Sequence, residues 1–303
     1  MGGQHGVTYR LDPARNRARI QRLGEFRVLG LHQIPQGAEI ASAVLVRRES
    51  GFYLQVTGYL PKETLAARQK FPHPVGVDLG VRDKLTLSGG LKVDFEVPET
   101  PRLNRLQRRL FRTKPGSKNR EHLRHLLRRE HGRIANRRRD AQNKVLAFLR
   151  RYPAVAFQED FVKGWSASFG RQVHHSGIGG LKARLRNSLA TPLPVERFER
   201  TTGECSACGE ALEVPLSARV VACPRCGRTE DRDLNAARVI LRKGLGLSPN
   251  QALGVDRSEV TPMEREAAVR ILGSNPWVRV SFLGEVGSPA LWCREEITHQ
   301  IGV

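Results

Sequence analysis

Alternating apolar and polar residues between Phe26 and Leu60 predict a β-hairpin. Its two sides are separated by a turn at residues 49–51, where Gly51 permits the chain to reverse. We expect this hairpin to belong to a small antiparallel sheet or a partial barrel within residues 26–72. The preceding residues, 1–25, are polar and rich in arginine, and we expect them to form a basic arm without a core.

A short apolar run from Val75 to Leu79 has the pattern of a buried strand, with Asp78 in its middle. A second strand is expected at residues 84–87. A buried carboxylate is costly unless its charge is compensated. Asp78 is therefore either a ligand of a divalent cation or a residue that caps a turn or pairs with one arginine. This stretch alone does not choose between the two.

A later apolar run, residues 154–157, is followed closely by Glu159 and predicts another strand that ends in a carboxylate. Residues 165–180 contain several glycines and the pair His174 and His175, and we expect a loop there. We leave the two histidines out of the predicted site, because isolated loop histidines are more often surface polar groups than catalytic ones.

Residues 101–151 are predicted to form a basic helical hairpin. Apolar residues recur at helical spacing on both sides of a break at residues 115–116, and Ser117 can cap the second helix. Between Arg102 and Arg139 there are fifteen Lys or Arg and two acidic residues. A run this unbalanced repels itself unless phosphates neutralise it, so we favour contact with a nucleic-acid backbone over a merely solvated face. The candidate contacts are Arg105, Arg108, Arg109, Arg112, Lys118, Arg120, Arg137 and Arg138.

The charge of the whole chain supports this interpretation. Its 303 residues, enough for one large or two modest domains, carry 51 Lys and Arg against 30 Asp and Glu, a net charge of +21. A surplus of this size in a globular composition indicates a polyanionic partner, most commonly nucleic acid, with an inert basic surface or an anionic membrane as alternatives. No apolar run approaches the roughly 18 residues of a membrane span, and no signal peptide is evident. We therefore expect a cytoplasmic protein, associated with the nucleoid and without a membrane partner.

Two Cys-x-x-Cys pairs, separated by fourteen residues, predict a zinc ribbon at residues 204–230. Two disulfides are the alternative. Nothing in the chain looks secreted, however, and a small ribbon without a core needs a metal. Because four cysteines leave no position for water, we expect the zinc to be structural. The predicted ligands are Cys205, Cys208, Cys223 and Cys226.

The ribbon leads directly to Asp233, which we expect at the start of a helix over residues 234–241, where the helix dipole favours an anion. Asp78, Glu159 and Asp233 thus come from three separate stretches. Carboxylates brought together repel one another unless a cation lies between them, and their oxygen atoms suit Mg²⁺ or Mn²⁺. Two such ions can hydrolyse a phosphodiester. The three carboxylates therefore predict a nuclease site.

These motifs resemble the RuvC domain of TnpB proteins, transposon-encoded nucleases related to type V CRISPR effectors. The matching segments are GVDLG at residues 76–80, FQED at 157–160, and CSACG, CPRCG and DRDLNAA within 205–237. Each motif alone is weak, but three in order, with the ribbon between the second and the third, are specific. The likeness covers residues 26–242.

The resemblance implies an α/β, RNase H-like RuvC domain that cleaves DNA under the guidance of an RNA from the mobile element. It implies that Asp78, Glu159 and Asp233 are the catalytic residues and magnesium ligands. The implied organisation begins with part of a wedge barrel at residues 26–72 and a nuclease core at 73–203, which the basic hairpin interrupts. The zinc ribbon follows at 204–230, and the last RuvC motif and its helix at 231–242. A loosely ordered tail is expected at 243–303.

The chain departs from this family in two ways. It begins close to the last wedge strands, so we expect an N-terminally shortened member whose recognition region is missing or is supplied by a second copy or another protein. Pro192 and Pro194 stand where a clean strand is expected, and we expect local damage to the sheet there.

Two functions therefore stay open. One is a metal-dependent, RNA-guided DNA endonuclease of the kind often labelled a transposase. The other is a nucleic-acid-binding remnant, or a guide-dependent regulator, that does not cut. A DDE-type transposase would not explain the position of the ribbon before Asp233. Sequence alone also does not exclude that Asp160 or Asp231 takes the role of its neighbour.

Overall fold

The computed structural model describes residues 9–49, 51–61, 63–64, 67–215, 217–252 and 259–283. The expectations for residues 1–8, 253–258 and 284–303 lie outside these described residues. The chain divides into two compact units, one formed by residues 1–68 and 105–132 and the other by residues 69–104 and 133–303. Each unit is described by itself. In the described parts of both, no helix is long and apolar enough to cross a membrane.

The first unit begins with a three-stranded antiparallel sheet in the order β1-β2-β3. Its strands are β1 (Tyr9–Asp12), β2 (Arg17–Ile20) and β3 (Gly24–Arg27). The sequence predicts a basic arm with little core for residues 1–25; in the structure, residues 9–25 form regular strands that bury little. In β1–β3, only the side chain of Ala18 is buried. The strands are held mainly by backbone pairing, and the apolar pattern therefore gave no signal for them.

The predicted hairpin is confirmed. Strand β4 (Glu39–Arg48) pairs antiparallel with β5 (Gly51–Tyr59), and their register runs from Glu39 opposite Tyr59 to Arg48 opposite Gly51. Glu49, beside the turn, accepts hydrogen bonds from His125 Nδ1 at 2.9 Å and from Arg128 at 2.8 Å. The turn is thereby joined to the basic helix α3 (Lys118–Leu149).

The basic helical hairpin is also confirmed, as α2 (Pro101–Arg112) and α3 (Lys118–Leu149). Ser117 caps α3, as expected, because its Oγ accepts a hydrogen bond from the backbone N–H of Arg120 at 3.2 Å. The break between the helices uses Gly116 at φ 77°, a left-handed conformation that favours glycine. The C-terminal part of α3 packs in the core of the second unit through Val145, Leu146 and Leu149.

The second unit is built on a mixed six-stranded sheet in the order β10-β9-β6-β7-β8-β13. Strands β10, β9 and β6 are parallel, and the remaining pairs are antiparallel. The sheet confirms the predicted α/β class and the strands expected around Asp78 and before Glu159. Its strands are β6 (Val75–Leu79), β7 (Leu85–Leu87), β8 (Leu91–Phe95), β9 (Val155–Gln158), β10 (Pro192–Val195) and β13 (Val278–Phe282).

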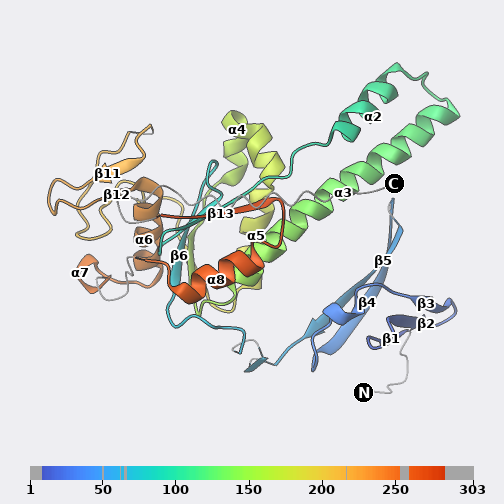
Figure 1. The fold of residues 1–303 in the computed structure, drawn as a ribbon, viewed down its shortest axis with the longest axis horizontal. Helices are drawn as coiled ribbons and strands as arrows, with labels where there is room; N and C mark the ends of the chain where they lie inside the picture. The colour runs from blue at the N-terminus through green and yellow to red at the C-terminus, as the bar shows by residue number, and fades with distance from the viewer. Residues whose placement is uncertain are drawn as a thin grey trace. The chain divides into compact units, whose positions relative to one another are not determined.

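Helices cover both faces of this sheet. On one face the end of α3, α5 (Ile178–Ser188) and α8 (Pro262–Ile271) enclose the larger core, into which Val77 and Phe157 point. On the other face lies α6 (Arg232–Gly244), drawn beside β6 in Figure 1. Its residues Ile240 and Leu241 pack against Ala156 and Val195 of the sheet. The two faces of β6 therefore meet different helices.

Helix α6 lies unusually close to the sheet backbone. A Cβ at Gly76 would lie 2.1 Å from the carbonyl oxygen of Ala237, and one at Gly244 would lie 2.6 Å from Ala156 Cβ. Glycine at these two positions therefore lets α6 lie directly on β6 and β9. This packing brings the start of α6 toward the end of β6.

Three further expectations are corrected by the structure. Residues 165–180 are not a loop but belong mostly to α4 (Val162–Ser176), which is kinked at Phe169. Pro192 and Pro194 do not damage the sheet, because β10 is an edge strand, where a missing N–H is tolerated. The tail after residue 243 is not loose throughout, since its described residues form α7 (Pro249–Ala252), α8 and β13.

The close packing of α6 predicts that replacing Gly76 by alanine lowers the stability of the second unit. We expect Gly76→Ala to reduce the free energy of unfolding by about 3 kcal/mol, because the added methyl group would overlap the backbone of α6. Urea unfolding followed by circular dichroism measures this. The matched control is Gly132→Ala in α3, where nothing lies within 4 Å of the added Cβ, and we expect a gain of up to about 1 kcal/mol there. Equal midpoints for Gly76→Ala and the unchanged protein would contradict the packing.

Candidate functional site

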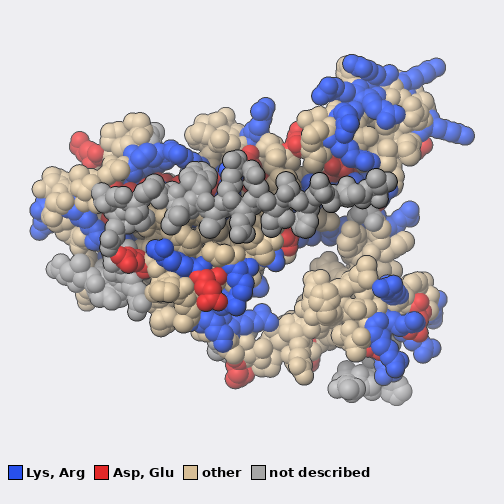
Figure 2. Space-filling view, viewed as in Figure 1, with Lys and Arg blue, Asp and Glu red and all other residues tan. Residues whose placement is uncertain are grey.

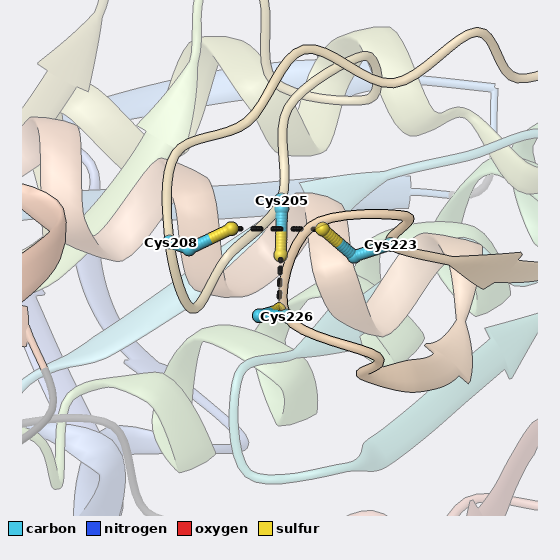
Figure 3. Close-up of side chains that lie close together, drawn as sticks. All are labelled: Cys205, Cys208, Cys223 and Cys226. Atoms are coloured by element: carbon cyan, nitrogen blue, oxygen red, sulfur yellow. Dashed lines mark hydrogen bonds between the residues drawn. The ribbon is translucent and has the colours of Figure 1, made fainter.

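Four cysteine side chains converge between two turns (Figure 3). The sulfur atoms of Cys205 and Cys226 are 3.7 Å apart, those of Cys208 and Cys223 are 3.5 Å apart, and all four lie within 4.8 Å of one another. Sulfur atoms arranged as a tetrahedron around zinc, at a Zn–S distance of about 2.3 Å, would be about 3.8 Å apart. The cluster is therefore consistent with a zinc ribbon, as the spacing predicts, and all four predicted ligands are brought together.

Each cysteine pair lies on the same kind of turn. The N–H of Gly209 donates to the carbonyl of Cys205, and that of Gly227 donates to the carbonyl of Cys223, both at 3.0 Å. The two glycines have φ near 75°, a conformation that favours glycine, which explains why a glycine follows each pair. Burial raises the pKa of the Cys205 thiol to about 12, whereas the backbone N–H of Cys226 lowers that of Cys223 to about 7.

The ribbon is joined to α6 by the buried side chain of Asn235. Its Oδ1 accepts a hydrogen bond from the backbone N–H of Ser206 at 2.8 Å, and its Nδ2 donates to the carbonyl of Glu204 at 2.7 Å. These two groups lie on either side of Cys205. Asn235 therefore fixes the first cysteine turn against the helix that carries Asp233.

A second connection runs from the ribbon to β6. Ser206 Oγ donates to Glu230 at 2.6 Å, and Glu230 also forms a buried ion pair with Arg238 of α6. Arg238 donates to the carbonyl of Ser88 at 3.1 Å, and the N–H of Gly76, two residues before Asp78, donates to Ser88 Oγ at 3.1 Å. Polar contacts therefore link the cysteine turn, α6 and the strand of Asp78.

Asp233 lies in the first turn of α6, as predicted, while Asp231 is the residue that caps the helix. Asp231 Oδ1 accepts from the backbone N–H groups of Asp233 at 3.0 Å and Leu234 at 3.1 Å. Its other oxygen pairs with Lys92 at 2.9 Å. Asp233 itself pairs with Arg232 at 3.2 Å. Asp231 is thus occupied by the helix cap and by Lys92, whereas Asp233 is paired only with arginines, since its other oxygen lies 3.9 Å from Arg219.

The carboxyl group of Asp78 lies near several other acidic groups. Its pKa is raised well above the usual value, first by burial and then by the charges of Asp233, Asp160 and Asp231, while Arg232 lowers it. Three like charges around one half-buried carboxyl group oppose its ionisation. A divalent cation would remove this opposition, because its charge stabilises all of the carboxylates together.

Glu159, the third predicted carboxylate, is bound to cationic side chains. Its two oxygen atoms pair with Lys182 at 3.0 Å and Arg186 at 2.9 Å, both on α5. The neighbouring Asp160 has a pKa raised to about 6, chiefly by burial, although Lys182 and Arg197 oppose the shift. Glu159 is thus paired with two cations, whereas the charge of Asp160 is one of those that raise the pKa of Asp78.

The oxygen atoms of the acidic residues do not all lie close enough together to surround a single ion. In the part of the chain that it describes, the four cysteines are the sole set of three or more possible ligands whose atoms lie within 4.8 Å. The carboxylates of Asp78, Glu159 and Asp233 therefore do not form one such set. Their role in binding Mg²⁺ stays a prediction.

The eight predicted nucleic-acid contacts differ in their surroundings. Figure 2 shows Lys and Arg side chains gathered over α2 and the beginning of α3. Arg120, by contrast, is half-buried and donates to the carbonyls of Leu110 and Thr113, so it holds the turn between the helices. Arg138 is also half-buried and donates to the carbonyl of Val97. The exposed members are Arg105, Arg108, Arg109, Arg112, Lys118 and Arg137.

Sequence reasoning missed the residues that hold the ribbon and the carboxylates in place. Asn235 belongs to the DRDLNAA motif and is a polar residue among apolar helical neighbours, which could have marked it. Lys92 and Arg238 carried no comparable signal, because their partners are distant in the sequence. The pair His174 and His175 was left out of the site, and the structure shows His175 paired with Glu96 at 3.0 Å.

Two known protein families match separate parts of the chain. The family described as "Cas12f1-like, TNB domain" matches residues 182–240, and the OrfB_IS605 family, described as "Probable transposase", matches residues 62–152. The matched residues contain Asp78, the four cysteines and Asp233. Residues 153–181, with Glu159 and Asp160, lie between the two matches.

Several curated proteins are similar in sequence. A Streptomyces pristinaespiralis protein named "Putative RNA-guided DNA endonuclease" is 30% identical over 226 residues, which cover 71% of this chain and 56% of that protein. The Escherichia coli (strain K12) protein "Putative RNA-guided DNA endonuclease InsQ" is 28% identical over 264 residues, 78% of this chain and 64% of that protein. "TnpB-like protein L79" of Acanthamoeba polyphaga mimivirus is 27% identical over 203 residues, 56% of this chain and 37% of that protein.

The chain therefore spans between 37% and 64% of the length of these relatives. Among solved structures, the complex titled "Cryo-EM structure of the Cas12f1-sgRNA-target DNA complex" matches 65% of this chain and 55% of that chain, with 16% identity. Its TM-score of 0.32 is too low to establish a common fold.

The contacts of Asn235 predict that this residue supports metal binding by the ribbon. In Asn235→Ala, the N–H of Ser206 and the carbonyl of Glu204 lose their partners, and we expect the affinity for Zn²⁺ to fall by about 10- to 100-fold. Competition with a chromophoric zinc chelator measures this. Asn187→Ala is the matched control, since Asn187 is an exposed residue of α5, and its zinc affinity should not change. Wild-type zinc affinity in Asn235→Ala would show that the residue serves packing alone.

Proposed function

Because the chain belongs to the TnpB family, the OrfB proteins of IS605-type elements, we propose that it is a metal-dependent DNA endonuclease guided by RNA. Two relatives of this chain carry the name "Putative RNA-guided DNA endonuclease". The proposed reaction is hydrolysis of phosphodiester bonds in DNA. The proposed metals are a structural Zn²⁺ in the ribbon and catalytic Mg²⁺ or Mn²⁺ at the carboxylates.

The observation that carries this proposal is the surroundings of Asp78. A half-buried carboxyl group whose ionisation is opposed by the charges of Asp233, Asp160 and Asp231 is unfavourable in a protein that needs only a stable fold. The oxygen atoms of such a group are the ligands that Mg²⁺ and Mn²⁺ prefer. The chemistry of the donors thus fits a divalent cation, although the side chains are not closed around one point.

Different residues of the chain would bind the metal ions and hold the metal-binding residues in position. Asp78 and Asp233, with a third carboxylate from β9, for which the sequence predicts Glu159, would hold the metal ions. Asp231 and Lys92 would keep the first turn of α6 in place. Bound in this way, divalent ions activate water and stabilise the leaving oxygen of a phosphodiester.

The exposed cations of α2 and α3 would bind the nucleic acid. Arg105, Arg108, Arg109 and Arg112 repeat along one basic helix, and few acidic residues interrupt them. Such a surface neutralises phosphates regardless of base sequence, which suits a guide–target duplex whose sequence is read by base pairing. DNA and a guide RNA are therefore the proposed partners.

A second function is favoured by one observation. Glu159 is neutralised by Lys182 and Arg186, and Gln158 beside it is uncharged. If Glu159, which follows β9, stays paired with these two cations, the site lacks one of its three acidic groups. The chain would then be a nucleic-acid-binding protein that does not cut, such as a guide-dependent regulator.

Removal of Asp78 separates the two functions. For the full chain purified with its co-expressed RNA, we expect Asp78→Ala to lower the rate of Mg²⁺-dependent DNA cleavage by about 10³-fold or more, because several kcal/mol of metal-derived stabilisation are lost. Plasmid cleavage assays measure this. Asp12→Asn, which removes an exposed acid in the first unit, is the control and should cleave normally. Undiminished cutting by Asp78→Ala would exclude the nuclease proposal, and an intact plasmid with the unchanged protein would favour the non-cleaving function.

Binding to DNA and RNA should depend on the exposed arginines of α2. We expect Arg108→Gln to weaken binding about equally for all nucleic-acid sequences. The slope of the logarithm of affinity against the logarithm of salt concentration should become smaller in magnitude by about 1, which corresponds to one lost phosphate contact. Fluorescence anisotropy at several salt concentrations measures both. Exposed Arg270→Gln in α8 is the control. An unchanged affinity and slope in Arg108→Gln would place the nucleic acid elsewhere.

A further inference from the structure

Two exposed phenylalanine rings of the second unit share one arginine. The guanidinium carbon of Arg197 lies 5.0 Å from the centre of the Phe161 ring and 5.2 Å from the centre of the Phe198 ring. Across the part of the chain that the structure describes, Arg197 is the arginine that lies over two rings. Phe161 is 51% exposed and Phe198 is 86% exposed. We call these three side chains the aromatic surface.

The fold gains little from the exposed rings of this surface. Phe198 is more exposed than any other large apolar side chain in the described part of the second unit, so it buries little apolar area on folding. An exposed guanidinium group over a ring adds only a weak attraction. Single exposed apolar side chains are common on proteins, but two rings gathered around one cation indicate a surface that binds something.

The aromatic surface lies at the edge of the sheet that also carries Asp78. Phe161 follows the end of β9, and Arg197 and Phe198 follow the end of β10. Strands β10, β9 and β6 are parallel, so their carboxyl ends meet at one edge, and Asp78 is the fourth of the five residues of β6. In open α/β sheets, this edge is where ligands bind. A ligand on the aromatic surface would therefore lie beside the proposed carboxylate site.

The backbone around Phe198 is fixed to β9. The side chain of Gln158, the last residue of β9, is buried. Its Nε2 donates to three backbone carbonyls, those of Glu196 and Arg197 at 3.2 Å and that of Glu199 at 2.8 Å. The segment that carries Arg197 and Phe198 is thus held in place before any ligand binds. Such preorganisation reduces the loss of conformational freedom on binding.

The ring of Phe161 is also held in place. It lies against the backbone of Gly164, where a Cβ would be only 2.8 Å from Phe161 Cδ1. The absence of a side chain at Gly164 therefore gives the ring its position at the start of α4. Together with the fixed segment after β10, this contact makes the aromatic surface a rigid platform.

The composition of the platform favours stacking over contact with phosphates. The segment after β10 carries acidic as well as basic residues, and one of its acids, Glu199, is paired with Lys243 at 2.6 Å. Phosphates are therefore not strongly attracted there. Nucleobases, by contrast, stack on aromatic rings and on guanidinium planes, whatever their sequence. In a duplex each base is already stacked on its neighbours, so only unpaired bases offer a free face to the rings.

We propose that Phe161, Arg197 and Phe198 bind unpaired bases of a single DNA strand at the carboxyl edge of the sheet. The choice of DNA rests on the proposed function, whose substrate is DNA. The platform complements the exposed arginines of α2, because those bind phosphates of any strand and the rings hold bases. A strand stacked on the platform would pass beside the carboxylates with its bases held away from them.

The test separates bases from phosphates. The full chain, purified with its co-expressed RNA, is titrated into labelled oligothymidylate of roughly ten nucleotides and into an abasic strand of the same length. Fluorescence anisotropy is read without Mg²⁺ or Mn²⁺, so that no strand is cut. We expect Phe198→Ala to weaken binding of oligothymidylate by at least about 5-fold, the lower end of what one stacked base contributes. Binding of the abasic strand, and the salt dependence of both affinities, should not change.

Further variants separate stacking from apolar contact and from folding. Phe198→Trp should bind oligothymidylate as well as the unchanged protein, whereas Phe198→Leu, which keeps an apolar side chain without a ring, should bind like Phe198→Ala. Phe52→Ala is the matched control, because it removes a 70% exposed ring from β5. The thermal unfolding temperature of Phe198→Ala should stay near that of the unchanged protein, since the ring is mostly in solvent.

Three results would overturn the proposal. They are unchanged binding of oligothymidylate by Phe198→Ala, equal weakening for the abasic strand, and full binding by Phe198→Leu, which would indicate an apolar partner. An oligouridylate of the same length identifies the strand, because an effect of Phe198→Ala on this RNA alone would exclude the DNA strand. If the affinities follow the expected order and plasmid stays intact, the stacking site stands and the nuclease function fails. If plasmid is cut and the affinities do not change, the reverse holds.

Discussion

The site depends on how closely α6 lies on the sheet. Glycine at positions 76 and 244 lets the backbone of the helix contact β6 and β9 directly, with no side chain between them. This contact brings the first turn of α6, with Asp231 and Asp233, to the end of β6, where Asp78 lies. A larger residue at either glycine would move the helix away and separate the carboxylates. The arrangement of acidic residues is thus a consequence of backbone packing and needs no attraction between the acids themselves.

The cysteine cluster is part of the same arrangement. The turn at Cys205 is bound to α6 by Asn235, and Glu230 and Arg238 extend the contacts to Ser88 beside β6. A ribbon of this size has few apolar residues of its own, and a bound metal would supply the stability that a core cannot. The first cysteine turn and the first turn of α6, which carries Asp233, are therefore connected by direct contacts.

The charge of the chain is divided between two tasks. On α2 and the beginning of α3, most cations are exposed and few acidic residues stand between them in the sequence, which suits a phosphate backbone. In the second unit, cations such as Lys92, Lys182 and Arg238 are paired with carboxylates or carbonyls and stabilise the fold. Among the described residues, some of the excess cations therefore form an exposed basic surface, and others are paired with acidic or carbonyl groups inside the second unit.

The sequence by itself determined the features that depend on local pattern. The cysteine spacing predicted the four-sulfur cluster, helical periodicity predicted α2 and α3 with the cap at Ser117, and apolar runs predicted β6 and β9. Tertiary structure decided what depends on distant partners. Strand β13 joins the sheet through β8, nearly two hundred residues earlier, and β10 tolerates two prolines because it lies at an edge.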